Sequence, residues 1–339
     1  MNIVLIAADT LRKDHLSCYG YSLKTSPNID ELASRGILFE NAIAQNIPTH
    51  PSFTSIYTGV HGLVTGVVGQ GPAEYTPGRL SGRFLVFPEL LQRAGYVTAA
   101  VDNLSSQEKP WFGRGYSHYI RPRERRGSGV TESATSWIRD HSDERFFLFV
   151  HYWNTHAPYL APEHLRGLYY RGVKDDPGNR SMEPLKKNHI YHLIFRRYDL
   201  VYGAVTDINY IKAQYDSCVT SLDEEAGKIA EAVGETGKET AIILASDHGE
   251  SLIEHDVYFD HTTLYEPDIR VPLIISGGDA LPSGKRIGAT VQNLDIAPTI
   301  LGLAGATVPS SMEGSSLLSL ASGERTEGYR EVVLTVSCW

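Results

Sequence analysis

The chain opens with Ile3-Val4-Leu5-Ile6-Ala7-Ala8 and turns polar at once with Asp9-Thr10. Such an apolar run has the length of a strand that is buried on both faces, as strands of parallel sheets are. In an open α/β sheet, ligands bind beyond the carboxyl ends of the strands, so the polar pair is the first candidate for chemistry. This stretch therefore predicts the type of sheet and the edge at which a site forms.

Further apolar runs alternate with helical patterns along the chain. The runs are Val97–Val101, Phe146–Val150, Ala241–Ala245 and Val271–Ile275. The expected helices, several of them closed by a glycine, are Pro27–Ser34, Phe87–Arg93, Thr131–Arg139, Asn209–Val233 and Asp295–Leu303. This alternation predicts a doubly wound α/β fold, with a mainly parallel sheet flanked by helices.

Composition and charge limit the classes of function. An apolar fraction of 42% in 339 residues provides for a large core and argues against a disordered chain. The net charge of −9 gives no field that attracts nucleic acid, so an anionic substrate needs a local cation or a metal. The first apolar run lacks a basic leader and is too short for a signal or membrane segment, so we expect a cytoplasmic protein with no membrane partner. Three cysteines, Cys18, Cys218 and Cys338, have no C-x-x-C spacing and are expected to be reduced.

Two strand ends carry residues that suit a metal ion. Asp9 follows the first run, and Asp247-His248 follows Ala241–Ala245, so a parallel sheet brings two carboxylates and an imidazole to one edge. Mg²⁺, Ca²⁺, Mn²⁺ and Zn²⁺ all accept such ligands, and ligand type does not choose among them. The alternative is that Asp9 caps a helix and Asp247-His248 is a solvated turn, and spacing alone leaves both open.

Thr49 stands just ahead of a predicted helix, in Pro48-Thr49-His50-Pro51-Ser52-Phe53. The positive end of a helix dipole favours an alkoxide and a bound anionic ester group, and metal coordination would lower the pKa of the hydroxyl further. An ordinary threonine N-cap is the competing interpretation. Thr49 is therefore a candidate nucleophile only in company with the metal ligands.

Several segments together resemble a known family. Ala8 to Tyr21, followed by Ser26 to Ala33, resembles the amino-terminal signature of the sulfatase family, within the alkaline phosphatase superfamily. Further similar segments are His151–Tyr159, Ser246–Glu250, Tyr265-Glu266 with Arg270–Leu273, and Asp295–Thr299. The resemblance implies an alkaline phosphatase-like fold, a small anionic ester as substrate, and one divalent metal ion held by Asp9, Asp247 and His248.

The resemblance also frames the domain organisation. It implies one catalytic domain over residues 1–339, with an insertion at about 161–202. Relatives usually continue into a smaller sheet subdomain, so we expect that part to be truncated after about residue 330.

The chain departs from the family pattern at the nucleophile. Family members carry C-x-P-S-R or S-x-P-S-R, whose first residue is oxidised to formylglycine, whereas this chain has Thr49-His50-Pro51-Ser52-Phe53. Formylglycine cannot be made from threonine, so we expect none. Related phosphoesterases use a metal-bound threonine, which favours a phosphate or phosphonate ester over a sulfate ester. Thr10 replaces a second aspartate of many relatives, as in some phosphonate monoester hydrolases.

The resemblance assigns the remaining site residues. His261 occupies the place of a lysine or histidine near the scissile ester and is the expected general acid. His156 corresponds to a substrate-contacting histidine, and His151 supports it from a strand end. Asn103 falls where many sulfatases have a lysine that binds the ester oxygens, and a neutral amide there weakens anion binding.

Two arginine features are expected to lie outside this site. Arg12 is expected to form a surface ion pair with Asp14. The Arg121–Arg126 cluster is expected to be a solvated loop, with contact to an anionic substrate tail as the alternative.

Other functions remain open from the sequence. A two-metal phosphodiesterase or phosphomutase-like enzyme would use His156, His255 and His261. A lipid-headgroup transferase would need membrane spans that the sequence lacks. From a different class, an altered nucleophile motif fits a catalytically inactive anion-binding protein. A sulfuric ester hydrolase and a homo-oligomeric assembly also stay open.

Overall fold

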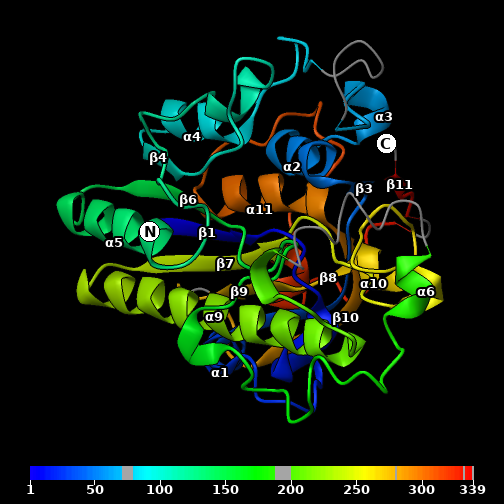
Figure 1. The fold of residues 1–339 in the computed structure, drawn as a ribbon. Coiled ribbons are helices and arrows are strands. Elements are labelled where there is room, and N and C mark those ends of the chain that lie inside the picture. The colour runs from blue at the N-terminus through cyan, green and yellow to red at the C-terminus, as the bar shows by residue number, and fades with distance from the viewer. Residues whose placement is uncertain (71–78, 188–199, 279–280, 331–332, 338–339) are drawn as a thin grey trace.

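The computed structural model describes residues 1–70, 79–187, 200–278, 281–330 and 333–337. The strands of the central sheet are β1 (Asn2–Ala8), β2 (Gly36–Ile43), β4 (Val97–Val101), β5 (His118–Ile120), β6 (Phe146–Tyr152), β7 (Thr240–Ser246), β8 (Arg270–Val271), β9 (Leu273–Ser276) and β10 (Lys285–Gln292). Their order is β10-β2-β9-β7-β1-β6-β4-β5, and β8 pairs with β2 beside this path (Figure 1). A separate two-stranded sheet joins β3 (Asn46–Ile47) to β11 (Val336–Ser337).

Strand direction confirms the predicted mainly parallel sheet. β1 runs parallel to both of its neighbours, β6 and β7, and β4 runs parallel to β5 and β6. β9 is antiparallel to β7 and to β2. The prediction of one continuous strand at Val271–Ile275 is wrong, because Pro272 separates β8 from β9. The antiparallel direction of β9 was not predictable, because an apolar run does not encode strand direction.

Helices cover both faces of the sheet, as a doubly wound fold requires (Figure 1). One face carries α1 (Pro27–Ser34), α5 (Ser128–Asp140) and α9 (Ile208–Glu235), and the other carries α2 (Thr49–Thr58), α4 (Phe87–Arg93), α11 (Ile296–Leu303) and α12 (Leu318–Ser322). The shorter helices are α3 (Gly62–Thr65), α6 (Glu183–Lys186) and α10 (Glu266–Ile269). Single 3₁₀ turns lie at Lys13–His15, Ser17–Tyr19, Pro110–Gly113, Glu163–Leu165, Glu254–Asp256 and Asn293–Asp295.

The core lies in two layers, one on each face of the sheet. Along β1, Val4 and Ile6 pack toward α1, α5 and α9, whereas Ile3 and Leu5 pack toward α2, α4 and α11. These side chains are almost fully buried, and each contributes roughly 2 kcal/mol of transfer free energy. A strand buried on both faces must be apolar throughout, and the opening run of the sequence predicted such a strand.

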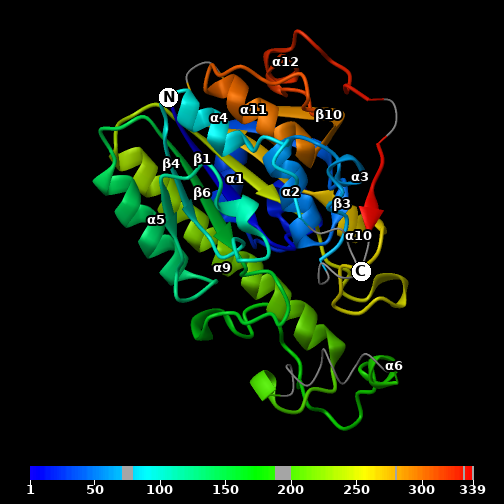
Figure 2. The ribbon, with the colours of Figure 1, turned by 90° about the horizontal axis from the view of Figure 1, so that it is seen from above.

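The described part of the segment predicted to be an insertion lies beside the body of the sheet. Figure 2 shows the segment around α6 extending away from the sheet beyond α9. Residues 188–199 of the predicted insertion at 161–202 lie outside the described residues, so the domain organisation stays a prediction. Among the residues described, no helix is long and apolar enough to cross a membrane.

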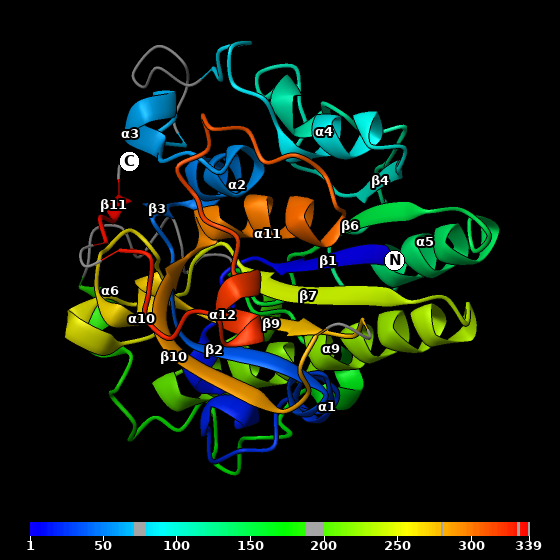
Figure 3. The ribbon, with the colours of Figure 1, turned by 180° about the vertical axis from the view of Figure 1, so that it is seen from behind.

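The last described segment returns to the loops at the carboxyl edge of the sheet. β11 pairs with β3, just before α2, as the view from behind in Figure 3 also shows. Ser337 Oγ donates a hydrogen bond to Thr262 O at 3.0 Å. The loop that contains His261 is therefore fixed in part by β11.

Candidate active site

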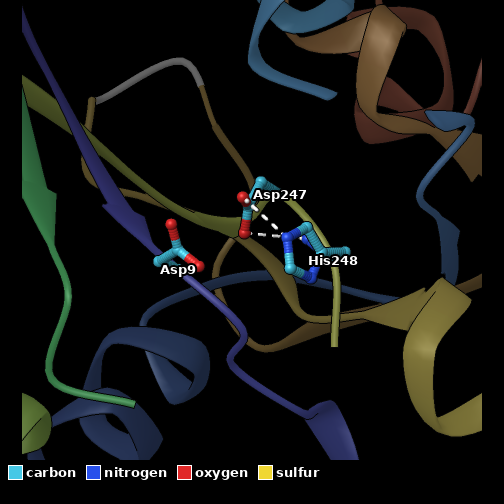
Figure 4. A group of neighbouring side chains, drawn as sticks. All are labelled: Asp9, Asp247 and His248. Carbon is cyan, nitrogen blue, oxygen red and sulfur yellow. Dashed lines mark hydrogen bonds and ion pairs between the residues drawn. The ribbon is translucent and has the colours of Figure 1, made fainter. Parts of the chain in front are cut away.

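Strand register brings three predicted metal ligands together. Ala8 lies opposite Ser246 in the parallel pair β1–β7, so Asp9 and Asp247 follow neighbouring strands at the same edge (Figure 4). One ligand atom from each of Asp9, Asp247 and His248 lies within 4.8 Å of the others, and all three residues are buried. The alternative of a solvated turn is therefore wrong.

The backbone around Asp247 is rigidly held. Asp247 O accepts hydrogen bonds from Ser52 Oγ at 2.7 Å and from Asn293 Nδ2 at 3.0 Å. Asp247 Oδ1 accepts from the backbone N–H of Thr10 at 3.2 Å, which ties the ends of β1 and β7 together. At position 249 only glycine fits, because a Cβ there would lie 1.9 Å from Pro267 O.

Three carboxylate oxygens of the cluster accept no hydrogen bond from the described residues. Within the described part of the chain, neither carboxylate oxygen of Asp9, nor Asp247 Oδ2, has a hydrogen-bond partner. Burial, followed by the charge of Asp9, raises the pKa of Asp247 well above its ordinary value, because two buried carboxylates so close together resist ionising at the same time. A bound cation relieves both costs, so the donor set fits a divalent metal ion.

His248 has its ring fixed in one tautomer. Its Nδ1 donates to Gly249 O at 2.9 Å, and burial, followed by the charge of His261, lowers its pKa to about 3. The imidazole is therefore neutral, with the lone pair on Nε2. A neutral ring with a fixed tautomer is the form in which histidine binds a metal.

Thr49 is the first residue of α2 and is fully buried. Its Oγ1 lies 3.3 Å from His248 Nε2. The competing N-cap interpretation is wrong, since Pro48 occupies the N-cap position. The hydroxyl lies where the helix dipole favours negative charge, beside the candidate metal ligands.

His261 lies over the same cluster. Its ring centroid is 4.5 Å from that of His248, and its Nδ1 is 2.8 Å from Glu250 Oε2. Burial lowers the pKa of His261, but the charge of Glu250 and this hydrogen bond outweigh that effect and raise the pKa to about 9. His261 is thus a cation near neutral pH, as a general acid requires.

His156 and His151 lie close to the cluster. The His156 ring is 5.4 Å from that of His261. His151 Nε2 is 3.7 Å from Asp9 Oδ2, and its Nδ1 is 2.8 Å from Asp102 Oδ1. Both histidines predicted from the sequence therefore lie at the site.

Sequence reasoning missed the acidic partners of the histidines. Asp102 fixes His151, whereas Asn103, predicted to bind substrate, is half-buried and has no recorded bond to the cluster among the described residues. Glu250 accepts from Tyr159 OH at 2.8 Å as well as pairing with His261. Glu250 was visible inside the Ser246–Glu250 motif, but nothing in the sequence distinguished Asp102 from Asn103.

The Arg12 side chain is buried between two loops and does not lie on the surface. Its side chain is only 4% exposed, so the predicted surface ion pair is wrong although its partner Asp14 is right. Its Nη1 atom also donates to Glu250 O at 3.1 Å and to Glu254 Oε1 at 2.8 Å. The guanidinium therefore links the loop after β1 to the loop after β7.

The predicted solvated cluster at Arg121–Arg126 is also partly wrong. Arg126 is half-buried and donates to the carbonyl oxygens of Trp153, His156 and Pro158, at 2.8, 2.7 and 2.9 Å. A half-buried guanidinium that satisfies three carbonyls fixes the backbone on either side of His156.

Comparisons with known proteins identify the family of this chain. A family model described as Sulfatase matches residues 1–306. The N-acetylglucosamine-6-O-sulfatase of Bacteroides thetaiotaomicron is 26% identical over 95% of this chain and 71% of its own length.

Two solved structures share the fold. One was determined with its substrate D-glucosamine-2-N,6-O-disulfate (TM-score 0.76, 23% identity, 97% of this chain and 81% of that chain). The other is a phosphonate monoester hydrolase from Silicibacter pomeroyi (TM-score 0.74, 20% identity, 96% of this chain and 77% of that chain). With the family match across most of its length, the chain belongs to the sulfatase family of the alkaline phosphatase superfamily, and it is an ester hydrolase of the sulfatase type.

Proposed function

We propose that the chain hydrolyses a phosphate or phosphonate ester in two steps, with unmodified Thr49 as the nucleophile. One observation carries this proposal: the Thr49 hydroxyl is buried at the start of α2, 3.3 Å from His248 Nε2 and beside Asp9 and Asp247. A hydroxyl in that position needs no oxidation to act as a nucleophile on phosphorus.

Asp9, Asp247 and His248 would hold one divalent metal ion. Bound there, the ion would polarise a non-bridging oxygen of the ester and lower the pKa of the Thr49 hydroxyl. Two carboxylates and one imidazole suit Mn²⁺, Mg²⁺, Ca²⁺ or Zn²⁺.

The chemical steps use the chain's own residues. Before the first step, the Thr49 hydroxyl loses its proton to solvent. In the first step, the Thr49 Oγ1 alkoxide forms a bond to phosphorus, the bond from phosphorus to the leaving oxygen breaks, and His261 donates the proton on Nε2 to that oxygen. In the second step, neutral His261 takes a proton from water, the water oxygen bonds to phosphorus, and the bond to Thr49 Oγ1 breaks. The cycle returns the Thr49 alkoxide and protonated His261 to their starting forms.

Two further histidines orient the reactants. His156 contacts the ester from the side of His261. His151 acts through Asp9, because its Nε2 lies 3.7 Å from Asp9 Oδ2 while Asp102 fixes the opposite side of the ring. Asn103, from the loop after β4, is proposed to contact the ester oxygens weakly.

A sulfate ester is the second candidate substrate. The named relative N-acetylglucosamine-6-O-sulfatase favours it, whereas the threonine favours phosphorus, because threonine cannot become formylglycine. The two candidate substrates would use the same metal ligands. They differ in the group that Thr49 carries before the second step, which is a phosphoryl or phosphonyl group in one case and a sulfuryl group in the other.

Turnover of a substrate panel separates these candidates. The panel contains 4-nitrophenyl phosphate, a 4-nitrophenyl phosphodiester, a 4-nitrophenyl phosphonate and 4-nitrophenyl sulfate, each tested metal-free and with Mn²⁺, Mg²⁺, Ca²⁺ or Zn²⁺. We expect a higher kcat/KM for a phosphorus ester and dependence on added metal. A preference for 4-nitrophenyl sulfate, with Thr49 unmodified by mass spectrometry, would overturn the assignment of phosphorus as the reacting atom.

A further inference from the structure

A cavity of about 530 Å³ opens beside His156. Its lining includes Trp153, His156 and Leu160 from one loop, and Glu124, Arg125 and Arg126 from another. None of the proposed chemical steps uses this space. Its size suits a ring-sized group rather than a single anion.

The cavity walls are fixed by hydrogen bonds between the two loops. Arg126 binds the three carbonyl oxygens of the 153–158 loop, and Trp153 N donates to Arg125 O at 3.1 Å. Gly127 N also donates to Asn154 Oδ1 at 2.9 Å. Because the walls are held together in this way, the cavity is a preformed feature.

The cavity adjoins the candidate active site at His156, which lines the cavity and contacts His261. The Trp153 ring centroid is 5.2 Å from that of His156, and the His156 ring is 5.4 Å from that of His261. His261 is the proposed proton donor to the leaving oxygen. The cavity therefore lies next to the residue that is proposed to protonate the leaving oxygen, with the His156 ring between them.

The lining combines an apolar wall with positive charge. Trp153 and Leu160 offer apolar surface, and the Arg125 guanidinium lies 5.4 Å from the Trp153 ring centroid. Arg125 is exposed and forms no recorded ion pair within the described residues. Two guanidinium groups, Arg125 and Arg126, outnumber the single carboxylate of Glu124, so the lining has a net positive charge.

We infer that this cavity binds the alcohol part of the ester and selects a ring that bears a second anionic group. The ring contacts Trp153 and Leu160, and Arg125 binds the second carboxylate, sulfate or phosphate through its planar fork of N–H donors. This inference rests on the proposed function, since it places the leaving group relative to His261. It adds a binding determinant that is remote from the reacting atoms.

Binding of two stable analogues tests the inference. Benzylphosphonate replaces the ester oxygen by carbon and is not hydrolysed, and its 3- and 4-carboxy derivatives add a second anion on the ring. With Mn²⁺-loaded protein in calorimetry, at least one carboxy derivative should bind about fivefold more tightly than benzylphosphonate, and salt should reduce this preference. Arg125→Gln should abolish the preference and leave benzylphosphonate binding within about twofold.

Matched variants separate a specific contact from general charge. Arg123→Gln removes a nearby exposed arginine that does not line the cavity, so it should leave the preference intact. Arg125→Lys keeps the charge but not the planar fork, and should retain part of the preference. Equal losses in Arg123→Gln and Arg125→Gln, no preference in the unaltered protein, or no binding of any analogue would each overturn the inference. Because these ligands are not turned over, a failure of Thr49 as nucleophile would appear in the ester panel and not in this comparison.

Discussion

Asp9 and Asp102 lie at the carboxyl ends of parallel strands in one sheet, and neither has exposed surface, yet their surroundings differ. Asp102 is satisfied by the protein: Oδ1 pairs with His151, and Oδ2 accepts from Leu104 N and Tyr119 OH. Asp9 has no hydrogen-bond partner for either carboxylate oxygen among the described residues.

This difference separates two uses of a buried carboxylate. A satisfied carboxylate gains its stabilisation from the fold and can orient a neighbouring side chain. A carboxylate that accepts no hydrogen bond costs free energy in the fold, and the binding of a cation offsets that cost. We therefore expect substitutions of Asp9 and of the residues beside it to affect activity more than stability. Substitution of Asp102 should affect both.

The largest effect on activity is expected at Thr49, which lies beside the candidate metal ligands. Thr49→Ala should lower kcat by at least about 10⁴-fold, because the nucleophile itself is lost. Thr49→Ser keeps a hydroxyl and should retain most of the activity. Steady-state kinetics on the best ester of the panel measures both variants. Unaltered turnover by metal-loaded Thr49→Ala would remove Thr49 from the mechanism.

Asp9→Asn should lower kcat/KM by about a thousandfold, because it removes a negative charge that helps to hold the metal ion. Metal-free Asp9→Asn should lose less stability than metal-free Asp102→Asn, since Asp9 has only the 3.7 Å ion pair with His151 and its removal also relieves repulsion with Asp247. Thermal unfolding with and without Mn²⁺ measures this. A metal at about a hundred times its Kd stabilises the parent by about 2.7 kcal/mol, and this gain should vanish in Asp9→Asn. A gain of equal size in both proteins would place the metal elsewhere.

Asp102→Asn should have a smaller effect on activity and a larger one on stability. Losing the partner that fixes His151 should lower kcat/KM by about 10- to 100-fold, as loss of an orienting partner commonly does. Breaking a buried pair should also reduce the free energy of unfolding by about 3 kcal/mol. Denaturant unfolding of the metal-free protein checks the second effect. If Asp102→Asn and Asp9→Asn had the same effect on stability, the contrast between the two aspartates would be wrong.

The smallest expected effect is a change in pH dependence at Glu250. Because Glu250 raises the pKa of His261 to about 9 against the opposing effect of burial, the protonated acid persists below that pH. In the parent, kcat/KM should fall as pH rises through about 9. In Glu250→Gln the fall should begin at least about one pH unit lower. Tyr159→Phe removes the other hydrogen bond to Glu250 and serves as the control, with its fall expected near that of the parent.

Much of the fold was predictable because buried parallel strands are apolar throughout. β1, β4, β6 and β7 were visible as such runs, and α1 and α4 have the predicted bounds. β2 and β10 were missed, because Gly36–Ile43 and Lys285–Gln292 include polar and charged residues, and their burial depends on strand pairing that the sequence does not state.

The site was predictable where a residue follows a strand directly. Asp9, Asp247 and His248 meet because β1 and β7 are parallel neighbours. Asp102 also follows a strand, but whether it or Asn103 turns inward depends on donors from Leu104 and Tyr119, and Tyr119 lies on another strand. The burial of Arg12 likewise depends on Glu250 and Glu254, more than two hundred residues away.

Trapping the covalent intermediate tests the central claim most directly. The metal-loaded protein is mixed with a slowly cleaved phosphorus ester from the panel, quenched in acid during turnover, digested and sequenced by mass spectrometry. We predict a phosphoryl or phosphonyl adduct on Thr49, reduced in amount when the substrate is exhausted and absent from Thr49→Ala. Sustained turnover with no adduct on Thr49, or with the adduct on another residue, would contradict the account.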